Sequence, residues 1–162
     1  SGAMSLIVRD AAPADAVLIL RFIEDLADYE KLRHEAEATV ADIERELFGP
    51  APKVFCQIAE WKGKPAGFAL WFYTFSTFVG RHGIWLEDLF VRPDMRGHGV
   101  GKGLLADLAA RCVRERLGRL EWAVLDWNEP SIEFYRSRGA VFMDEWRRCR
   151  VSGEALNRLG AK

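Results

Sequence analysis

Four stretches of the chain have the residue pattern of α-helices. The first follows Pro13 and carries apolar residues at helical spacing as far as Tyr29. The strongest pattern lies after the glycine-rich stretch near residue 100, has one continuous apolar face, and has Gly118 as its candidate C-terminal cap. The predicted helices cover residues 13–29, 40–47, 104–113 and 130–138.

The stretches between these helices are rich in β-branched and aromatic residues, as strands are. Lys62-Gly63-Lys64-Pro65 supplies a turn, so the strands on either side of it are expected to pair as a hairpin. Pro93 cannot continue a ladder and therefore ends the fourth strand. The predicted strands cover residues 6–9, 54–60, 66–74, 84–91 and 120–125, with one or two more in 141–151.

This order of elements predicts a mixed α/β fold. Four or more consecutive antiparallel strands are expected to give way to a β-α-β crossover built around the helix at 104–113. Such crossovers are right-handed, so the last strands are expected to run parallel to the strand at 84–91. No repeat, linker or low-complexity segment interrupts the order.

Length and composition favour a single globular domain. The 162 residues are 49% apolar and 29% charged, and no run of apolar residues is long enough to cross a bilayer. Residues 1–3 and the following Met4 have the appearance of an expression-tag remnant joined to the native start, without the pattern of a secretory signal. We therefore expect one domain over residues 4–162, with no membrane partner.

Charge and cysteine content exclude several classes of function. A formal net charge of -1 without a basic cluster makes nucleic acid a poor partner. The cysteines are odd in number and lack zinc-site spacing, which favours reduced thiols in a cytoplasmic protein. The histidines have no carboxylate or cysteine at ligand spacing, so no metal is expected. These residues are Cys56, Cys112, Cys149, His34, His82 and His98.

The segment Arg96-Gly97-His98-Gly99-Val100-Gly101 lies between a predicted strand and the strongest helix. Its backbone N–H groups therefore gather at the positive end of that helix, where they can bind an anion. A nucleoside-triphosphate loop would need glycine at position 96 and a hydroxyl residue at position 103. A dinucleotide fold would carry its glycines after the first strand. A tight turn without a ligand stays possible.

A strand ending Leu89-Phe90-Val91, followed by this turn, resembles the coenzyme A loop of the GNAT family of N-acetyltransferases. Further matching segments are similar to the spermidine/spermine acetyltransferase branch, and Ala123 to Asn128 is most similar to its thialysine N-acetyltransferase members. Those segments are residues 19–30, Trp85-Leu86-Glu87-Asp88, and 127–140. The resemblance implies the GNAT fold, acetyl-coenzyme A as co-substrate, and transfer of acetyl to a primary amine in a ternary complex.

The resemblance also implies the cofactor contacts. The amides of the turn would bind the pyrophosphate, and a backbone N–H near a splay or bulge of the preceding strand would polarise the thioester carbonyl. Asn128 and Ser131 would contact the cofactor, although Asn128 could equally cap a helix. The implied contacts are Leu89, Phe90, Val91, Arg96, Gly97, His98, Gly99, Val100, Gly101, Asn128, Ser131 and Tyr135.

Two catalytic roles follow from the same resemblance. Glu87 would take the proton of the amine, directly or through water, and Tyr135 would protonate the departing thiolate. Asp88 competes with Glu87, because adjacent strand residues point to opposite faces. Alternatively, Glu87 could be an ordinary exposed glutamate and Tyr135 a core tyrosine, and neither would then have a catalytic role.

A cationic amine suits carboxylates and aromatic faces. The candidate substrate residues are Tyr29, Glu30, Ser76, Phe78 and Trp85, although an exposed Glu30 and a core Trp85 would need no ligand. Polyamine enzymes of the branch carry an acidic residue at the place of Ser76, which weakens the case for a polyamine. Related enzymes form homodimers, and the apolar segment from Phe142 to Val151 is the candidate interface.

Two other functions stay open at this point. The enzyme could acetylate a protein N-terminus or lysine, for which the aromatic stretch from Trp71 to Phe78 would line a peptide groove. Alternatively, the chain could be a binding module for acyl-coenzyme A that performs no chemistry. The presence of both Glu87 and Tyr135 argues against the second alternative.

Overall fold

A computed structural model describes residues 5–161. The expected tag remnant at residues 1–3 lies outside the described part. The chain divides into two compact units, the first extending to Ala123 and the second beginning at Val124. The expectation of a single domain over 4–162 stays a prediction, and each unit is described by itself.

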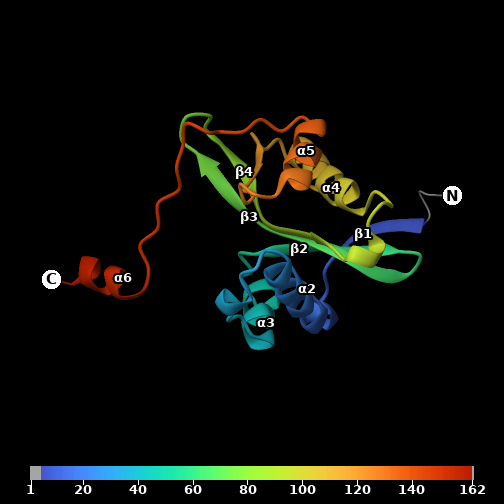
Figure 1. Cartoon of the computed structure of the whole chain (residues 1–162), viewed down its shortest axis with the longest axis horizontal. Coiled ribbons are helices and arrows are strands. Elements are labelled where there is room, and N and C mark those ends of the chain that lie inside the picture. Colours follow the sequence, from blue (N-terminus) through green and yellow to red (C-terminus); the bar gives the residue numbers. More distant parts are fainter. Residues whose placement is uncertain (1–4, 162) are drawn as a thin grey trace. The chain divides into compact units, whose positions relative to one another are not determined.

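The first unit contains one five-stranded sheet in the order β1-β2-β3-β4-β5 (Figure 1). Its first four strands are antiparallel, and β5 runs parallel to β4. The predicted mixed α/β fold with a β4-α4-β5 crossover is confirmed. The strands are β1 Leu6–Asp10, β2 Phe55–Trp61, β3 Lys64–Ser76, β4 Arg81–Val91 and β5 Leu120–Trp122.

Helices cover both faces of this sheet. Figure 1 shows α2 and α3 on one face and α4 on the other. Short 3₁₀ turns precede α2, follow it, and lie between β4 and the glycine turn. The helices of the first unit are α2 Ala16–Tyr29, α3 Val40–Phe48 and α4 Val100–Arg114, and the turns are Pro13–Asp15, Arg33–Glu35 and Pro93–Met95.

The main core lies between the sheet and the two helices α2 and α3. Phe22 of α2 is 1% exposed, and its ring stacks on Phe68 of β3 at 5.3 Å and lies 6.1 Å from Phe90 of β4. Because these rings are buried together, they fix α2 against the far end of β4. This contact brings the C-terminal end of α2 to the strand that carries the candidate catalytic residues.

A chain of polar side chains holds α4 on the opposite face. The indole N–H of Trp71 donates to buried Gln57, whose amide donates to Asp10 at 2.6 Å. Arg111 of α4 contacts Asp10 at 3.4 Å and lies 5.1 Å above the Trp71 ring. These bonds satisfy Gln57 inside the sheet layer and tie α4 to strands β1, β2 and β3.

Helix α4 ends earlier than its predicted cap. The helix stops at Arg114, and Arg116 takes the left-handed conformation with φ 58°. Gly118 instead donates its N–H to His82 O at 2.8 Å. The Gly118 cap is therefore wrong, because the chain reverses within Glu115 to Leu117 and glycine is used for the approach to β4.

The second unit contains α5 Glu129–Ser137 and α6 Gly153–Gly160. The α5 prediction is confirmed, whereas α6 was not predicted. No strand forms over residues 141–151 of the described chain, and β5 ends at Trp122 rather than Leu125. Apolar residues of this stretch, such as Val141 and Trp146, are exposed. The predicted last strands are wrong, because a strand pattern forms a strand only where a ladder partner is present.

Candidate active site

The glycine turn between β4 and α4 requires glycine for its backbone and not for packing. Gly97 and Gly99 have φ 85° and 77°, the left-handed region, and Gly99 caps α4. A Cβ added at either position would meet no atom within 4 Å. The space beside both glycines is therefore open.

The N–H groups of this turn are available to a ligand. Among the hydrogen bonds of the described residues, none of the N–H groups from Gly97 to Gly101 donates to a protein acceptor. They lie at the N-terminus of the 15-residue helix α4, where the helix dipole is positive. Open space, free donors and a positive dipole together form an anion site.

The strand before the turn separates from its parallel neighbour. β4 pairs with β5 only over Ile84 to Leu86, although β4 continues to Val91. On its other side β4 remains paired with β3 as far as Val91 and Gly67. Within the described part of the chain, the edge of Glu87 to Val91 that faces away from β3 therefore has no ladder partner. Because successive residues of a strand point their N–H and C=O groups to opposite edges, only alternate residues of this stretch, such as Leu89, have backbone groups that the sheet does not use.

A β-bulge occurs in β4 at the predicted catalytic residues. Asp88 pairs with Leu70 and Leu86 pairs with Trp71, so Glu87 is the extra residue without a partner on β3. The expectation that Glu87 and Asp88 point to opposite faces assumed strict alternation, which does not hold across a bulge. The pairing of Asp88 with Leu70 assigns Asp88 to the face on which Leu70 and Phe90 join the α2 core.

Three carboxylates interact at this bulge. Burial, and then the negative charges of Glu87 and Glu30, raise the pKa of Asp88 to about 7. Burial also raises the pKa of Glu30, which follows α2 directly. Glu87 itself is exposed. Asp88 therefore exchanges a proton near neutral pH, the property required of a general base.

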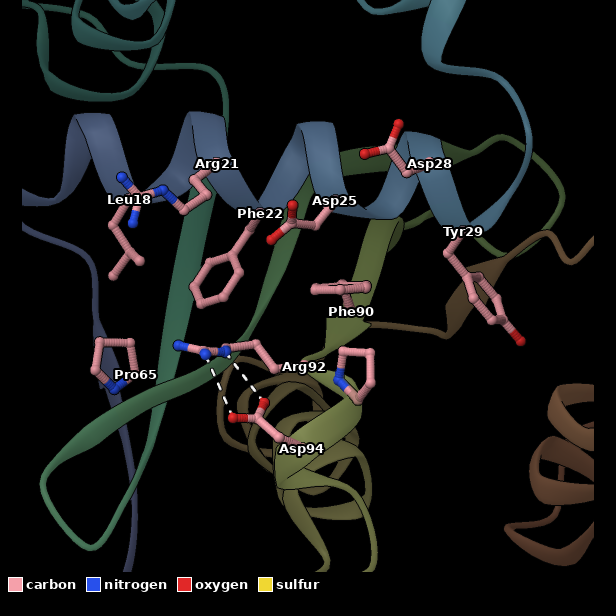
Figure 2. A pocket seen from close by; sticks show the side chains of 11 residues that line it. Leu18, Arg21, Phe22, Asp25, Asp28, Tyr29, Pro65, Phe90, Arg92 and Asp94 are labelled. Carbon is pink, nitrogen blue, oxygen red and sulfur yellow. Dashed lines mark hydrogen bonds and ion pairs between the residues drawn. The ribbon is translucent and has the colours of Figure 1, made fainter.

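A pocket of about 770 Å³ lies between α2 and the end of β4 (Figure 2). Two predicted residues, Tyr29 and Phe90, line it, and the guanidinium of Arg96 lies 5.1 Å above the Tyr29 ring. The pocket thus joins the end of α2 to the start of the glycine turn. Its lining residues are Leu18, Arg21, Phe22, Asp25, Asp28, Tyr29, Pro65, Phe90, Arg92, Pro93 and Asp94.

The acidic residues Asp25 and Asp28 of this pocket were not among the predicted site residues. Together with Leu18, Phe22 and Tyr29 they recur at intervals of three and four, so they share one face of α2. The same helical period that predicted α2 could have identified them, once Tyr29 was taken as a site residue. Asp28 also pairs with a nearby arginine, Arg33, at 2.9 Å.

Three predicted substrate residues lie elsewhere on the hairpin of β3 and β4, and two of them are near its tip. Ser76 pairs with Arg81, and its hydroxyl accepts from Val79 N at 3.3 Å. Phe78 is 98% exposed at the tip. At about 3.4 Å per residue, the six steps from Arg81 to Glu87 span roughly 20 Å, so Ser76 and Phe78 are not brought to the carboxylates.

Trp85, the third, lies between the tip and the bulge. It is half-buried in β4, where it pairs with Phe72 of β3 and with Glu121 of β5. Because a sheet position of this kind can be occupied for packing alone, the interpretation of Trp85 as a core residue fits its surroundings.

The remaining predicted residues belong to the second unit. The carboxamide oxygen of Asn128 accepts from Ser131 N at 3.4 Å, which confirms the alternative that Asn128 caps α5. Tyr135 is buried on α5, and its ring lies 5.6 Å from that of Phe134. Their cofactor contacts and the role of Tyr135 as an acid stay predictions.

Within residues 5–161, neither a cluster of metal-binding side chains nor a membrane-spanning helix is present. No group of three or more histidine, cysteine or carboxylate side chains is arranged to hold a metal ion within residues 5–161. No helix of that range is both long and apolar enough to cross a membrane.

Comparisons with known proteins assign the chain to a family. Residues 19–140 match the model of the acetyltransferase (GNAT) family. The thialysine N-epsilon-acetyltransferase of Bos taurus is 33% identical, over 97% of this chain and 98% of the relative. The L-ornithine N5-acetyltransferase of Arabidopsis thaliana is 36% identical over 78% of this chain and 52% of the relative.

Solved structures share the fold. An integron cassette protein from the mobile metagenome of V. cholerae superposes with a TM-score of 0.82 at 26% identity, covering 98% of this chain and 99% of that one. An aminoglycoside acetyltransferase from an uncultured soil sample, in complex with sisomicin, has a TM-score of 0.73 at 12% identity, covering 94% and 97%. The chain therefore belongs to the acetyltransferase (GNAT) family and is an N-acetyltransferase.

Proposed function

We propose that the protein transfers the acetyl group of acetyl-coenzyme A to a primary amine of a small molecule, in a ternary complex without an acetylated enzyme. The observation that carries this proposal is that a negatively charged region and a positively charged region both lie next to β4. The negative end of α2, with Glu30, Glu87 and Asp88, suits an ammonium group, and the positive end of α4 suits a pyrophosphate.

For the cofactor, the N–H groups of the glycine turn are the proposed pyrophosphate site. The unpaired edge of β4 supports a second contact, in which a backbone N–H from Leu89 to Val91 polarises the thioester carbonyl. The assignment of Asn128 and Ser131 rests on the family resemblance alone. No metal is required for this chemistry.

A Gly99→Asp variant should bind acetyl-coenzyme A roughly thirtyfold more weakly. Two like charges about 8 Å apart repel by about 2 kcal/mol at an effective dielectric constant near 20. Gly99→Asn is the matched control, because asparagine has nearly the same shape and also tolerates the left-handed conformation. Calorimetry of both folded variants measures the difference, and equal affinities would contradict the pyrophosphate assignment.

For the chemistry, the amine nitrogen attacks the carbonyl carbon, the C–N bond forms, and the C–S bond breaks. The resemblance assigns the proton of the amine to Glu87, but the raised pKa of Asp88 and its place at the bulge favour Asp88 as the base. Exposed Glu87 then attracts the cationic amine. Tyr135 gives a proton to the departing thiolate and recovers one through solvent, so the products are an acetamide and a free thiol.

The proposed substrates are only a part of the primary amines. Curated relatives are named for thialysine and L-ornithine, both of which carry a terminal amine on a short chain. The acidic face of α2 beside Tyr29 supports a lysine-like amine or a diamine.

A thiol-release assay with acetyl-coenzyme A tests this substrate class. The panel contains thialysine, lysine, ornithine, diamines, spermidine and short peptides with a free N-terminus. The proposal predicts the highest kcat/KM for a lysine-like amine. Faster turnover of the peptides would instead indicate a protein acetyltransferase, and thiol release with none of the amines would indicate a binding module.

We also propose a homodimer. The second unit exposes large apolar side chains along residues 141–151, which form no strand, and on helix α6, and a second copy would cover this surface. These side chains are Val141, Met143, Trp146, Val151, Leu156 and Leu159. Light scattering at micromolar concentration should give twice the chain mass, and Trp146→Glu should lower it. A monomer in the unaltered protein would contradict the dimer.

A cytoplasmic location is the last part of the proposal. The three cysteines of the described chain are free, two of them buried. Reduced thiols and an acetyl-coenzyme A requirement are both typical of the cytoplasm.

A further inference from the structure

The one side chain between the two left-handed glycines of the turn stacks on the sheet. The imidazole of His98 lies against the indole of Trp61, with ring centroids 4.5 Å apart and planes inclined by 9°. Trp61 ends β2, far from the turn in sequence. The stack therefore joins the middle of the turn to the end of a strand.

The Trp61 side of this contact is well fixed. Trp61 pairs with Leu6 of β1 on one side and with Lys64 of β3 on the other. Lys62 and Gly63 connect β2 to β3 with φ 50° and 79°, and Lys62 N donates to Ser5 O at 2.8 Å. An indole at the end of a doubly paired strand is therefore a rigid support.

The His98 side lacks comparable support. Gly97 and Gly99 give the turn conformational freedom, and its N–H groups make no bond to protein acceptors within the described chain. Donors that must converge on an anion lose affinity when they are free to reorient. A contact that holds His98 thus restricts the backbone on both sides of it.

We propose that Trp61 is a positioning residue for cofactor binding. It acts through His98 to hold the N–H groups of the turn in the conformation that receives the pyrophosphate, and it does not touch the cofactor itself. This inference rests on the proposed function of the turn and adds a residue outside it to the binding of acetyl-coenzyme A.

Replacement of Trp61 by alanine should weaken coenzyme A binding about fivefold, on the scale of one aromatic pair. Trp61→Phe should restore most of the affinity, because a phenyl ring can stack on His98. Acetyl-pantetheine lacks the pyrophosphate, so its kcat/KM as acetyl donor should be unchanged in Trp61→Ala. A merely structural loss would lower both quantities.

Phe75→Ala is the matched control. Phe75 also contacts a histidine, His82, at 5.0 Å, but at the other end of the sheet. Its loss removes a comparable aromatic pair and should leave coenzyme A affinity unchanged. An equal loss of affinity in Phe75→Ala and Trp61→Ala would overturn the proposal.

A double-mutant cycle with His98→Ala completes the test. His98 is exposed, so this variant remains informative even if Trp61→Ala folds poorly. If the two residues act through their stack, the double variant should bind coenzyme A as weakly as either single variant. Additive losses, or unchanged affinity in both single variants, would overturn the proposal. Unchanged affinity in Gly99→Asp would instead overturn the pyrophosphate site itself.

Discussion

An Asp88→Asn enzyme is expected to acetylate its best amine about 10³-fold more slowly in a single turnover, within the range for loss of a general base. Only the carboxylate form can accept a proton. The rate of the unaltered enzyme should therefore rise with pH up to about 7, the pKa of Asp88, and then level off. The Asp88→Asn enzyme should lack this dependence. Rapid-quench measurements over a pH range on both sides of that pKa give both results.

Glu87→Gln is the matched comparison, because it neutralises the adjacent carboxylate of the same bulge. We expect it to raise KM for the cationic amine and to leave the single-turnover rate at saturation within about tenfold of the unaltered enzyme. The opposite result, a large rate loss in Glu87→Gln and a small one in Asp88→Asn, would assign the base to Glu87, as the family resemblance implies.

Asp88→Asn should also change how the free energy of unfolding depends on pH. The pKa of Asp88 rises from 3.8 to about 7 on folding, so its stabilising contribution is present below pH 3.8 and is lost as the pH rises through 7. Asp88→Asn removes that loss. The gain in the free energy of unfolding should be larger at a pH of about 8 than at a pH of about 5, as measured by urea denaturation.

A Tyr135→Phe enzyme is expected to lose about 10²-fold in single-turnover rate, the lower end of the range for general acids, because a coenzyme A thiolate is a stable leaving group. Phenylalanine keeps most of the packing of this buried ring, so affinity for acetyl-coenzyme A should change little. Single-turnover kinetics are needed, because slow product release can hide a chemical defect.

Tyr73→Phe is its control. It also removes one tyrosine hydroxyl, which lies on β3 and donates to Glu115 at the end of α4 at 2.7 Å. Its single-turnover rate should equal that of the unaltered enzyme. A loss below about threefold in Tyr135→Phe would make Tyr135 a packing residue, because general acids contribute far more.

Local sequence patterns were sufficient for the strands and helices of the first unit, although not for the C-terminal cap of α4. The apolar period of α2 and α4, the Lys62-Gly63 turn and the break at Pro93 each act through neighbouring residues, and the structure has them close to their expected places. The segment 141–151 has an equally convincing strand pattern and forms no strand in the described chain. Its outcome depends on a ladder partner, which a local pattern does not encode.

In the candidate site, too, features set by neighbouring residues could be predicted and features set by distant partners could not. The glycine turn was found because its residues are consecutive and follow a strand. The bulge at Glu87 was expected a little later in the strand, and it changes the relation of Glu87 to Asp88 through the pairing with β3. The stack of Trp61 on His98 joins residues distant in sequence, and nothing in either local pattern signals it.

The most direct test of the proposed direct transfer is a stoichiometric single-turnover reaction with thialysine. Enzyme, acetyl-coenzyme A and amine are mixed, and free thiol, acetylated amine and intact protein mass are measured together. Direct transfer predicts one thiol for each N-acetylthialysine formed, with no acetyl group on the protein at any time. Acetylated protein before product appears, or cofactor binding without any acetylated amine, would contradict it.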